Sequence, residues 1–453
     1  MTTETIDAAL DPDRVGAEMY ALMTELYPIC RSITGAGLRQ TLALIGEHIP
    51  LQVHEVPTGT EAYDWTVPRE WNIRDAYVKN ARGDKVIDFS ESSLHVVNYS
   101  TPIQRKMSLA ELRPHLFTLP DRPEWIPYRT SYYKESWGFC LSHNQFEQLE
   151  EGDYEVVIDS TLQDGSLSYG ELYLPGKRAE EVLISAHACH PSMCNDNLSG
   201  VVLATFLAKH LQTIDTELSY RFVFGPGGIG SIVWLSRNEA VVPNIKHGLV
   251  AVCVGDPGDF TYKRSRQGNA MIDRAAINVL ESMGGNYGVI DFSPYGYDER
   301  NYSAPAFDLP VGSLTRTTHA CFPQYHTSGD DLSFVRPKSL GESVAAYRSI
   351  LNVLDNDRTY LTLHPKCEPQ LGKRGLYGLM GGLQDRDSKE VAMLWVLNFS
   401  DGRHSLLDIS ERSGIAFEDL RHASDLLHQH GLIKLMSEGD DPIGPGYATL
   451  PVK

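Results

Sequence analysis

The chain contains no long apolar run and no signal of export at its N-terminus. No stretch approaches the roughly 18 consecutive apolar residues that a transmembrane helix requires, so we expect no membrane span and no membrane partner. The first residues, MTTETIDAALDPDR, lack the basic and apolar regions of a secretory signal peptide. These absences predict a cytoplasmic protein.

Positive charge and cysteine are also scarce, which excludes two further classes of protein. The formal net charge is −19, whereas a surface that binds nucleic acid needs lysine and arginine to neutralise phosphates. We therefore expect no nucleic-acid partner. Seven cysteines in 453 residues are too sparse, and odd in number, for a disulfide framework. Most of them should be reduced and buried.

Strands and helices alternate in the central part of the chain, from about residue 153 to 365. EVLISAH, YRFVFG and LVAVCVG are typical of buried strands, and NLSGVVLATFLAKHL and AMIDRAAINVLESM of helices. Such alternation predicts an α/β fold in which helices cover both faces of a sheet. Functional loops are then expected at the C-terminal ends of the strands.

Two segments differ from this α/β part in composition and in hydrophobic pattern. Residues 60–150 are rich in Trp, Tyr and Pro with short alternating runs, which favours a small β-rich inserted domain. Residues 385–453 predict three short helices and a β-like end, the pattern of a winged helix. The main domain would then be discontinuous, at 1–59 and 151–380. The last helix, FEDLRHASDLLHQHG, carries too much acid to bind phosphates, so we interpret the winged helix as a packing or dimerisation module. A homo-oligomer could form through either added domain.

The densest group of potential metal ligands lies in Ser185–Gly200, SAHACHPSMCNDNLSG. This segment follows a predicted strand and opens a predicted helix, so His187, His190 and Asp196 would be held at a strand end. Imidazole and carboxylate together suit Zn²⁺ or another divalent transition metal. In the alternative interpretation, the asparagines and serine of this segment only cap the helix.

His187 followed by DNLSG at a helix start resembles the M28-type zinc aminopeptidases. The resemblance implies that His187 binds a metal, that Asp196 bridges two metals, and that the peptide bond after Asp196 is cis. Asp256, after LVAVCVG, and His326, in YHTSGDD, stand where that family has another carboxylate and a final histidine. The implied zinc site therefore consists of His187, Asp196, Asp256 and His326.

Segments spread over nearly the whole chain resemble a nearer family, DUF4910/DUF2172, whose members are often described as polysaccharide-biosynthesis proteins with an aminopeptidase-like domain. These segments are YPICRSITGAGLRQTL, DWTVPREWNIRDAYV, LHVVNYSTPI, IPYRTSYYKESWGFC, AHACHPSMCNDNLSGV, YDERNY, YHTSGDD and EPQLGKRGLYG. The resemblance implies an M28-like mixed sheet, a β-rich insertion and a C-terminal winged helix.

The chain departs from the peptidase pattern at the loop after YRFVFG. M28 peptidases need a glutamate there as general base, and the resemblance places one at Gly227. Here the loop Gly225–Ser231 reads GPGGIGS and contains no acid. General acid–base catalysis contributes about 10²–10⁴-fold, so ordinary peptide hydrolysis should be slow.

A second departure is Cys189, which stands where the M28 peptidases have an aspartate that orients the histidine. Cys189 and His190 become candidate further ligands, and we expect one zinc ion rather than two. Alternatively, Cys189 and Cys194 are small buried fillers.

Three other polar residues are candidate catalytic groups. Glu299 could replace the missing base, Arg300 could bind a substrate carboxylate through its planar guanidinium, and Tyr325 could donate to an oxyanion. The alternatives are a salt-bridged surface loop for Glu299 and Arg300, and packing for Tyr325. Asp330 and Asp331 are expected to cap the turn that follows them.

Together these features predict a metal-dependent amide-bond hydrolase of aminopeptidase type, acting on a small amino-acyl or peptide-like substrate in a biosynthetic pathway. Two alternatives stay open. One is a non-catalytic metal-binding or assembly protein, favoured by the loop without acid. The other keeps the fold but performs cyclisation or acyl transfer, as glutaminyl cyclases do.

Overall fold

The computed structural model describes residues 6, 11–376 and 388–444, and parts of the predicted domain ranges, with the end of EPQLGKRGLYG, lie outside them. The chain divides into two compact units. The first contains the residues up to Asp273 together with Asn286–Arg348, and the second contains Arg274–Gly285 and the residues from Ser349 onward. The predicted inserted domain falls within the first unit, and its boundaries stay a prediction.

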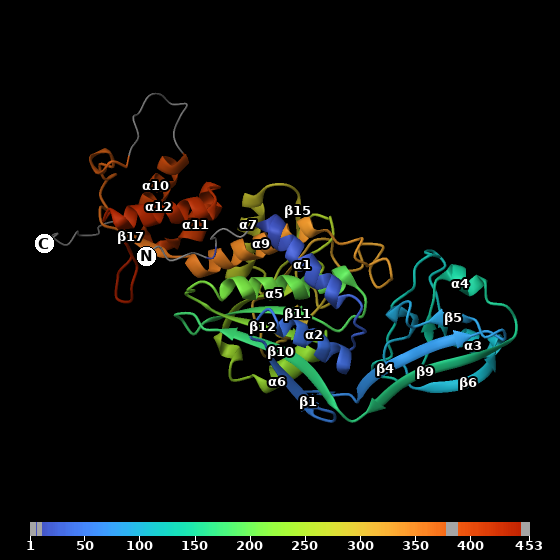
Figure 1. Cartoon of the computed structure of the whole chain (residues 1–453). Helices are drawn as coiled ribbons and strands as arrows, with labels where there is room; N and C mark the ends of the chain where they lie inside the picture. Colours follow the sequence, from blue (N-terminus) through green and yellow to red (C-terminus); the bar gives the residue numbers. More distant parts are fainter. Residues whose placement is uncertain (1–5, 7–10, 377–387, 445–453) are drawn as a thin grey trace. The chain divides into compact units, whose positions relative to one another are not determined.

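The first unit is built on an eight-stranded mixed sheet (Figure 1). Its four central strands are parallel, and two of them, Glu181–His187 and Ser219–Gly225, are buried along their whole length, which explains their largely apolar sequences. In spatial order the strands are β1 (Gln52–Pro57), β10 (Ser166–Leu174), β12 (Ser219–Gly225), β11 (Glu181–His187), β13 (Ile245–Ala251), β16 (Val311–Thr315), β14 (Phe260–Lys263) and β15 (Tyr287–Ile290).

Helices cover both faces of this sheet, as predicted. Helix α5 (Ser199–Leu211) packs on β11, β12 and β13, and α6 (Ile229–Arg237) lies on the opposite face (Figure 1). Almost every residue of α5 is buried, because α1 covers its outer side. The other helices and helical turns are α1 (Pro12–Leu26), α2 (Ala36–Gly46), η3 (Cys194–Leu198), η4 (Val242–Asn244), α8 (Glu299–Tyr302) and α9 (Pro337–Asn356).

A second, antiparallel sheet supports the prediction of a β-rich segment. It has the strand order β5 (Lys85–Asp88), β4 (Glu70–Lys79), β9 (Asp153–Gln163), β6 (Ile103–Ser108) and encloses its own apolar core. The shorter elements around it are β2 (Glu61–Ala62), β3 (Trp65–Thr66), η1 (Ser93–His95), α3 (Leu109–Leu112), η2 (Arg113–His115), β7 (Leu116–Phe117), β8 (Phe139–Cys140) and α4 (His143–Glu147).

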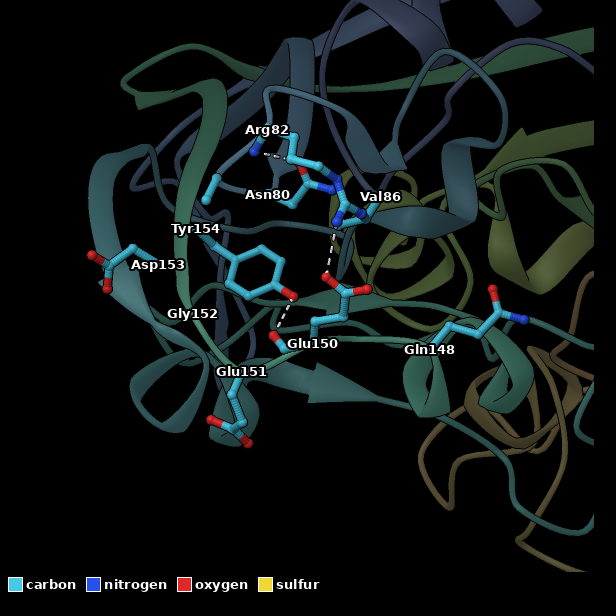
Figure 2. Close-up of a pocket in the computed structure, with 10 residues that line it drawn as sticks. Asn80, Arg82, Val86, Gln148, Glu150, Glu151, Gly152, Asp153 and Tyr154 are labelled. Atoms are coloured by element: carbon cyan, nitrogen blue, oxygen red, sulfur yellow. Dashed lines mark hydrogen bonds and ion pairs between the residues drawn. The ribbon is translucent and has the colours of Figure 1, made fainter.

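Figure 2 shows a small pocket of about 90 Å³ beside this second sheet. Arg82 crosses it and donates to the Glu150 carboxylate at 3.0 Å, and the Tyr154 hydroxyl donates to the Glu150 carbonyl at 2.7 Å. Because these groups already bind one another, the pocket does not resemble a prepared ligand site.

The second unit contains the winged helix that the sequence predicts. Its three-stranded sheet has the order β18 (Asp401–Ser405), β17 (Thr359–Thr362), β19 (Ile433–Leu435), so β17, outside the predicted range, pairs with both other strands. The helices are α7 (Met271–Met283), η5 (Gly372–Arg374), α10 (Ser388–Phe399), α11 (Leu406–Ser413) and α12 (Phe417–Gln429).

Two expectations about the whole chain can be compared with the structure. Among the described residues, no helix combines the length and the apolar character needed to cross a membrane. All seven cysteines are free thiols, and the buried ones are Cys140, Cys189, Cys194 and Cys253.

Candidate metal centre

The residues with metal-binding side chains meet at the C-terminal edge of the parallel strands. His187 is the last residue of β11, where it lies in register with Gly225, the last residue of β12. The chain then passes through η3, which carries Asp196, and enters α5. In open α/β sheets this edge forms the usual ligand crevice. The bond Asp196–Asn197 is cis, as the resemblance to M28 peptidases implied.

Asp196 lies between two imidazoles and is fully buried. Its Oδ1 is 3.0 Å from Nε2 of His187, and its Oδ2 is 2.9 Å from Nε2 of His326. Burial opposes ionisation of this carboxyl, but His190, His187 and His326 together outweigh burial and hold the pKa of Asp196 well below its usual range. The carboxylate is therefore charged and offers one oxygen to each side.

His190 adds a third imidazole to this group. His187, His190 and Asp196 each offer a ligand atom within 4.8 Å of the others. The His190 ring centroid lies 4.9 Å from that of His187 and 5.2 Å from that of His326. Burial lowers the pKa of His190 well below its usual value, although Asp196 opposes the shift. This lowered pKa favours the neutral imidazole, which is the form that binds metals.

Two tyrosines fix the position of His326. Its ring stacks on Tyr325 with centroids 4.0 Å apart and meets the edge of the Tyr128 ring at 5.2 Å. The Tyr128 amide also donates to the His326 carbonyl at 2.9 Å. The contacts of Tyr325 favour the packing interpretation, and Tyr128 brings the predicted inserted domain to the edge of the site.

Asp256 accepts hydrogen bonds from the protein through both of its carboxylate oxygens. Its Oδ1 accepts from the Thr317 hydroxyl at 2.6 Å and from the Gly258 amide at 2.8 Å. Its Oδ2 accepts from the Asn195 side chain at 3.0 Å and from the Thr317 amide at 3.2 Å. Protein donors thus occupy both oxygens, and Asp256 supports η3 through Asn195.

Cys253 lies closer to the centre than the sequence suggested. Strand β13 ends at Ala251, before the predicted end of LVAVCVG, and Cys253 has a φ of +50°. Burial, followed by the charge of Asp196, raises the pKa of the Cys253 thiol well above its usual value. Its sulfur lies 3.3 Å from the Tyr297 hydroxyl. Nothing in the sequence distinguished this cysteine from an ordinary core residue.

The backbone that carries Asp196 is held by Asp330. Its Oδ1 accepts from the Asn195 amide at 2.6 Å, and its Oδ2 accepts from the Asp196 amide at 2.8 Å. The expectation that Asp330 caps the following turn was wrong, because its carboxylate points back to η3. Asp331 does accept from the Ser333 amide at 2.8 Å, so that part of the expectation is confirmed.

Arg31 holds the other side of the centre and was missed by the sequence reasoning. It is fully buried, and its Nε donates to the His190 carbonyl at 3.0 Å. Its Nη1 donates to the Leu26 carbonyl at 2.6 Å. A buried arginine in RSITGAG carries no local signal of this role, because the partner that links it to the site, the His190 carbonyl, is distant in sequence.

The loop without acid borders His187 directly. A Cβ atom added at Gly227 would lie 3.5 Å from Cβ of His187 and 3.7 Å from Sγ of Cys189. The Gly227 amide donates to that sulfur at 3.2 Å, and burial raises the pKa of the Cys189 thiol to about 12. A side chain at position 227 would therefore begin beside the metal centre.

Glu299 and Arg300, the two polar candidates from YDERNY, differ in their surroundings. Glu299 is 1% exposed, forms an ion pair with Lys263 at 2.8 Å and accepts from the Tyr297 amide. These contacts favour an anchoring role for Glu299 over that of base. Arg300 is exposed, and its Nη2 would lie 3.9 Å from a Cβ at Gly228. Arg300 therefore borders the glycine loop.

Two family descriptions match the chain. Residues 20–357 match a domain of unknown function, DUF4910, and residues 358–435 match a winged helix-turn-helix. A relative from Clostridium acetobutylicum is 55% identical over 421 residues, which covers 93% of this chain and 97% of the relative. It is described as a polysaccharide biosynthesis protein with an aminopeptidase-like domain.

Solved structures also match the chain. The crystal structure of a protein described as a peptidase, from Clostridium acetobutylicum, has 53% identity and a TM-score of 0.90, covering 94% of this chain and 97% of that one. BSAP, a zinc aminopeptidase from Bacillus subtilis, has 12% identity and a TM-score of 0.54, with coverages of 74% and 94%. An M28 peptidase precursor from Shewanella amazonensis has 14% identity and a TM-score of 0.52, with coverages of 76% and 97%. The last two similarities establish the fold alone.

Proposed function

The chain belongs to the DUF4910 family, and we propose that it is a metal-dependent amide-bond hydrolase of aminopeptidase type. One observation carries the proposal. Asp196 lies between His187 and His326, with His190 beside it, at the strand edge of an M28-like fold. Imidazoles around one carboxylate form the donor set of a divalent metal site.

The donor chemistry fits zinc, held by His187, His190, Asp196 and His326. Asp256, implied as a ligand by the family resemblance, would first have to give up its protein donors. Since Asp196 is then the one carboxylate in the proposed ligand set, that set would not balance the charge of a second divalent ion. We therefore propose one zinc ion. When bound, it would polarise the scissile carbonyl and lower the pKa of a water molecule.

The chain's own residues orient this centre. Tyr297 stacks on the His187 ring with centroids 5.1 Å apart, and Tyr325 stacks on His326. Arg31 and Asp330 hold the backbone behind His190 and Asp196. Metal sites depend on such outer contacts, because they fix the direction of each ligand. These contacts would orient the imidazoles toward a bound metal.

The proposed substrate is a small amino-acyl or peptide-like amide in a biosynthetic pathway. The description of the Clostridium acetobutylicum relative supports the biosynthetic part. Arg300, exposed beside the glycine loop, has the geometry to bind a substrate carboxylate in a bidentate manner. Tyr325 stays a proposed donor to the oxyanion, in addition to its packing role.

Metal analysis and an amidase assay test this function. The purified full chain should retain about one zinc ion and release 4-nitroaniline slowly from L-aminoacyl 4-nitroanilides. Chelation should abolish the reaction, and added zinc should restore it. Mass analysis of the products would reveal cyclisation or acyl transfer instead of hydrolysis. A chain that binds no metal and cleaves no amide would contradict the proposal.

The lack of acid in Gly225–Ser231 favours one second candidate, a non-catalytic metal-binding or assembly protein. In α12 the one arginine is already paired, since Arg421 forms ion pairs with Glu418 and Asp425. This pairing fits a packing or dimerisation module better than a phosphate-binding one. Zinc binding without amide cleavage, in a stable dimer, would support this candidate.

A further inference from the structure

A buried carboxylate outside the proposed ligand set lies against the glycine loop. Asp298 is 3% exposed, and its Oδ1 accepts from the Gly228 amide at 2.7 Å and from the Ser231 hydroxyl at 2.9 Å. It directly follows Tyr297, whose ring stacks on His187. Asp298 therefore borders the loop that lacks an acid, and it interacts electrostatically with the histidine at the end of β11.

Asp298 also has no counter-ion. Within the described part of the chain it forms no ion pair with Lys or Arg, and its Oδ2 accepts no hydrogen bond. The adjacent Glu299, in contrast, is paired with Lys263. Burying an unpaired carboxylate costs free energy, and natural proteins concentrate such groups at functional sites.

The electrostatic surroundings of Asp298 agree with its lack of a cationic partner. Burial raises the pKa of Asp298, while the nearby His187 and the two hydrogen bonds oppose the shift. Two neighbouring carboxyl groups in unlike environments commonly divide their work, one remaining ionised and the other exchanging protons. Here Glu299 is held by Lys263, whereas the Asp298 carboxylate accepts, among the described residues, only from Gly228 and Ser231, as an exchanging group would.

We propose that Asp298 is the general acid–base residue of this site, in place of the glutamate that the glycine loop lacks. The inference rests on the hydrolase function proposed above. The Asp298 carboxylate takes a proton from water as the new C–O bond forms at the amide carbonyl. The protonated carboxyl then gives that proton to the leaving nitrogen as the C–N bond breaks. One water is consumed, and Asp298 returns to its starting form.

The competing interpretation is that Asp298 only caps α6. That helix has no capping side chain of its own, because its N-cap residue is Gly228. The two roles can be separated by chemistry. Asparagine retains an oxygen that can accept from Gly228 and Ser231, but it cannot exchange a proton at neutral pH. Alanine removes both functions.

The test compares zinc-loaded full-length Asp298→Asn and Asp298→Ala with wild type on L-aminoacyl 4-nitroanilides. The Asn variant should keep the zinc content and unfolding midpoint of wild type, while kcat falls on the order of 10²–10³-fold and KM changes little. Its residual activity should lose the acid limb of the wild-type pH profile. A matched control is Asp357→Asn, since Asp357 also accepts from the first turn of a helix, at the Leu407 amide, but lies in the second unit. This control should keep full activity.

The possible results distinguish a failure of the role proposed for Asp298 from a failure of the proposed hydrolase function. If wild type is active and Asp298→Asn keeps its rate and pH profile, Asp298 is only a cap and the inference is wrong, whereas the hydrolase stands. If zinc-loaded wild type cleaves no member of the panel, the hydrolase proposal fails and the inference fails with it. A lost rate accompanied by lost zinc in Asp298→Asn would also overturn the inference, because it would indicate a structural role.

Discussion

Oδ2 of Asp196 lies 2.9 Å from Nε2 of His326, although 130 positions separate the two residues in the chain. The same carboxylate meets His187, only nine positions away, through its other oxygen. The centre thus joins a local motif to a distant loop, and each half can be tested.

Loss of His326 should weaken metal binding more than it weakens the fold. We expect His326→Ala to lower zinc affinity by more than about 100-fold, the upper range for outer contacts, because a ligand itself is removed. Zinc titration monitored by calorimetry measures the effect. His422→Ala is the control, since His422 is exposed on α12. Equal zinc affinity in both variants would exclude His326 from the centre.

Asp330→Ala should destabilise the protein and the metal centre together. The buried amides of Asn195 and Asp196 would lose their acceptors, at roughly 1–3 kcal/mol each, so the free energy of unfolding should fall by about 2–6 kcal/mol. Zinc affinity should fall about 10–100-fold. Asp331→Ala, the neighbouring control, should cost about 1 kcal/mol or less. Urea unfolding and zinc titration measure both effects, and similar results for the two variants would contradict the role assigned to Asp330.

An acid placed at Gly227 should rescue the loss of Asp298. A Cβ there meets His187 and Cys189 at ordinary contact distances, so a glutamate fits beside the centre. In Asp298→Asn protein, adding Gly227→Glu should raise kcat on the order of 10²-fold, whereas in wild type the same change should be neutral or harmful. Gly228→Glu is a poor position, because Gly228 has a φ of +74°, and it should rescue nothing. Amidase rates of these variants test the prediction. A large gain in kcat from Gly227→Glu in the wild-type background would instead indicate that wild type has no general base.

Glu299→Gln should lower the free energy of unfolding rather than remove a catalytic group. The change leaves Lys263 buried, with 7% of its side chain exposed, and without its carboxylate partner. Breaking a buried pair in this way costs about 3–5 kcal/mol, measured as the free energy of unfolding. The double variant Lys263→Met, Glu299→Leu should recover most of that loss. If Glu299→Gln were as stable as wild type but inactive, Glu299 would be the base and Asp298 would not.

His247 should make the protein sensitive to acid. Burial, with Arg178 and Lys246 adding to it, lowers the pKa of His247 to about 4, and its Nδ1 has no hydrogen-bond partner in the described structure. Since the unfolded chain binds this proton near pH 6.5, stability should fall as the pH drops from 6.5 towards 4, by on the order of 2–3 kcal/mol. His247→Gln should remove this part of the loss. Urea unfolding at pH 7 and pH 4.5 gives the difference, and equal pH dependence of both proteins would contradict the assignment.

The sequence by itself determined the fold class and the local half of the centre. The largely apolar runs of β11 and β12 and the helical pattern of α5 predict a covered sheet, because backbone hydrogen bonding and burial impose those periods locally. His187 and Asp196 follow from the same short segment, since a strand end and a helix start hold them on one loop. His326 was identified through the resemblance to M28 peptidases, which have their final histidine ligand at this place in the chain order.

Only the tertiary structure decided which way the remaining polar groups point. Asp256 and Asp330 both occur in segments that the sequence brings to the strand edge. Asp256 accepts from Asn195 and Thr317, however, whereas Asp330 accepts from the η3 backbone. Asp298 and Glu299 are adjacent in sequence but face different neighbours, the glycine loop and Lys263. Successive side chains leave the backbone in different directions, so a one-residue step selects another environment. That selection depends on packing between distant segments, which no local pattern encodes.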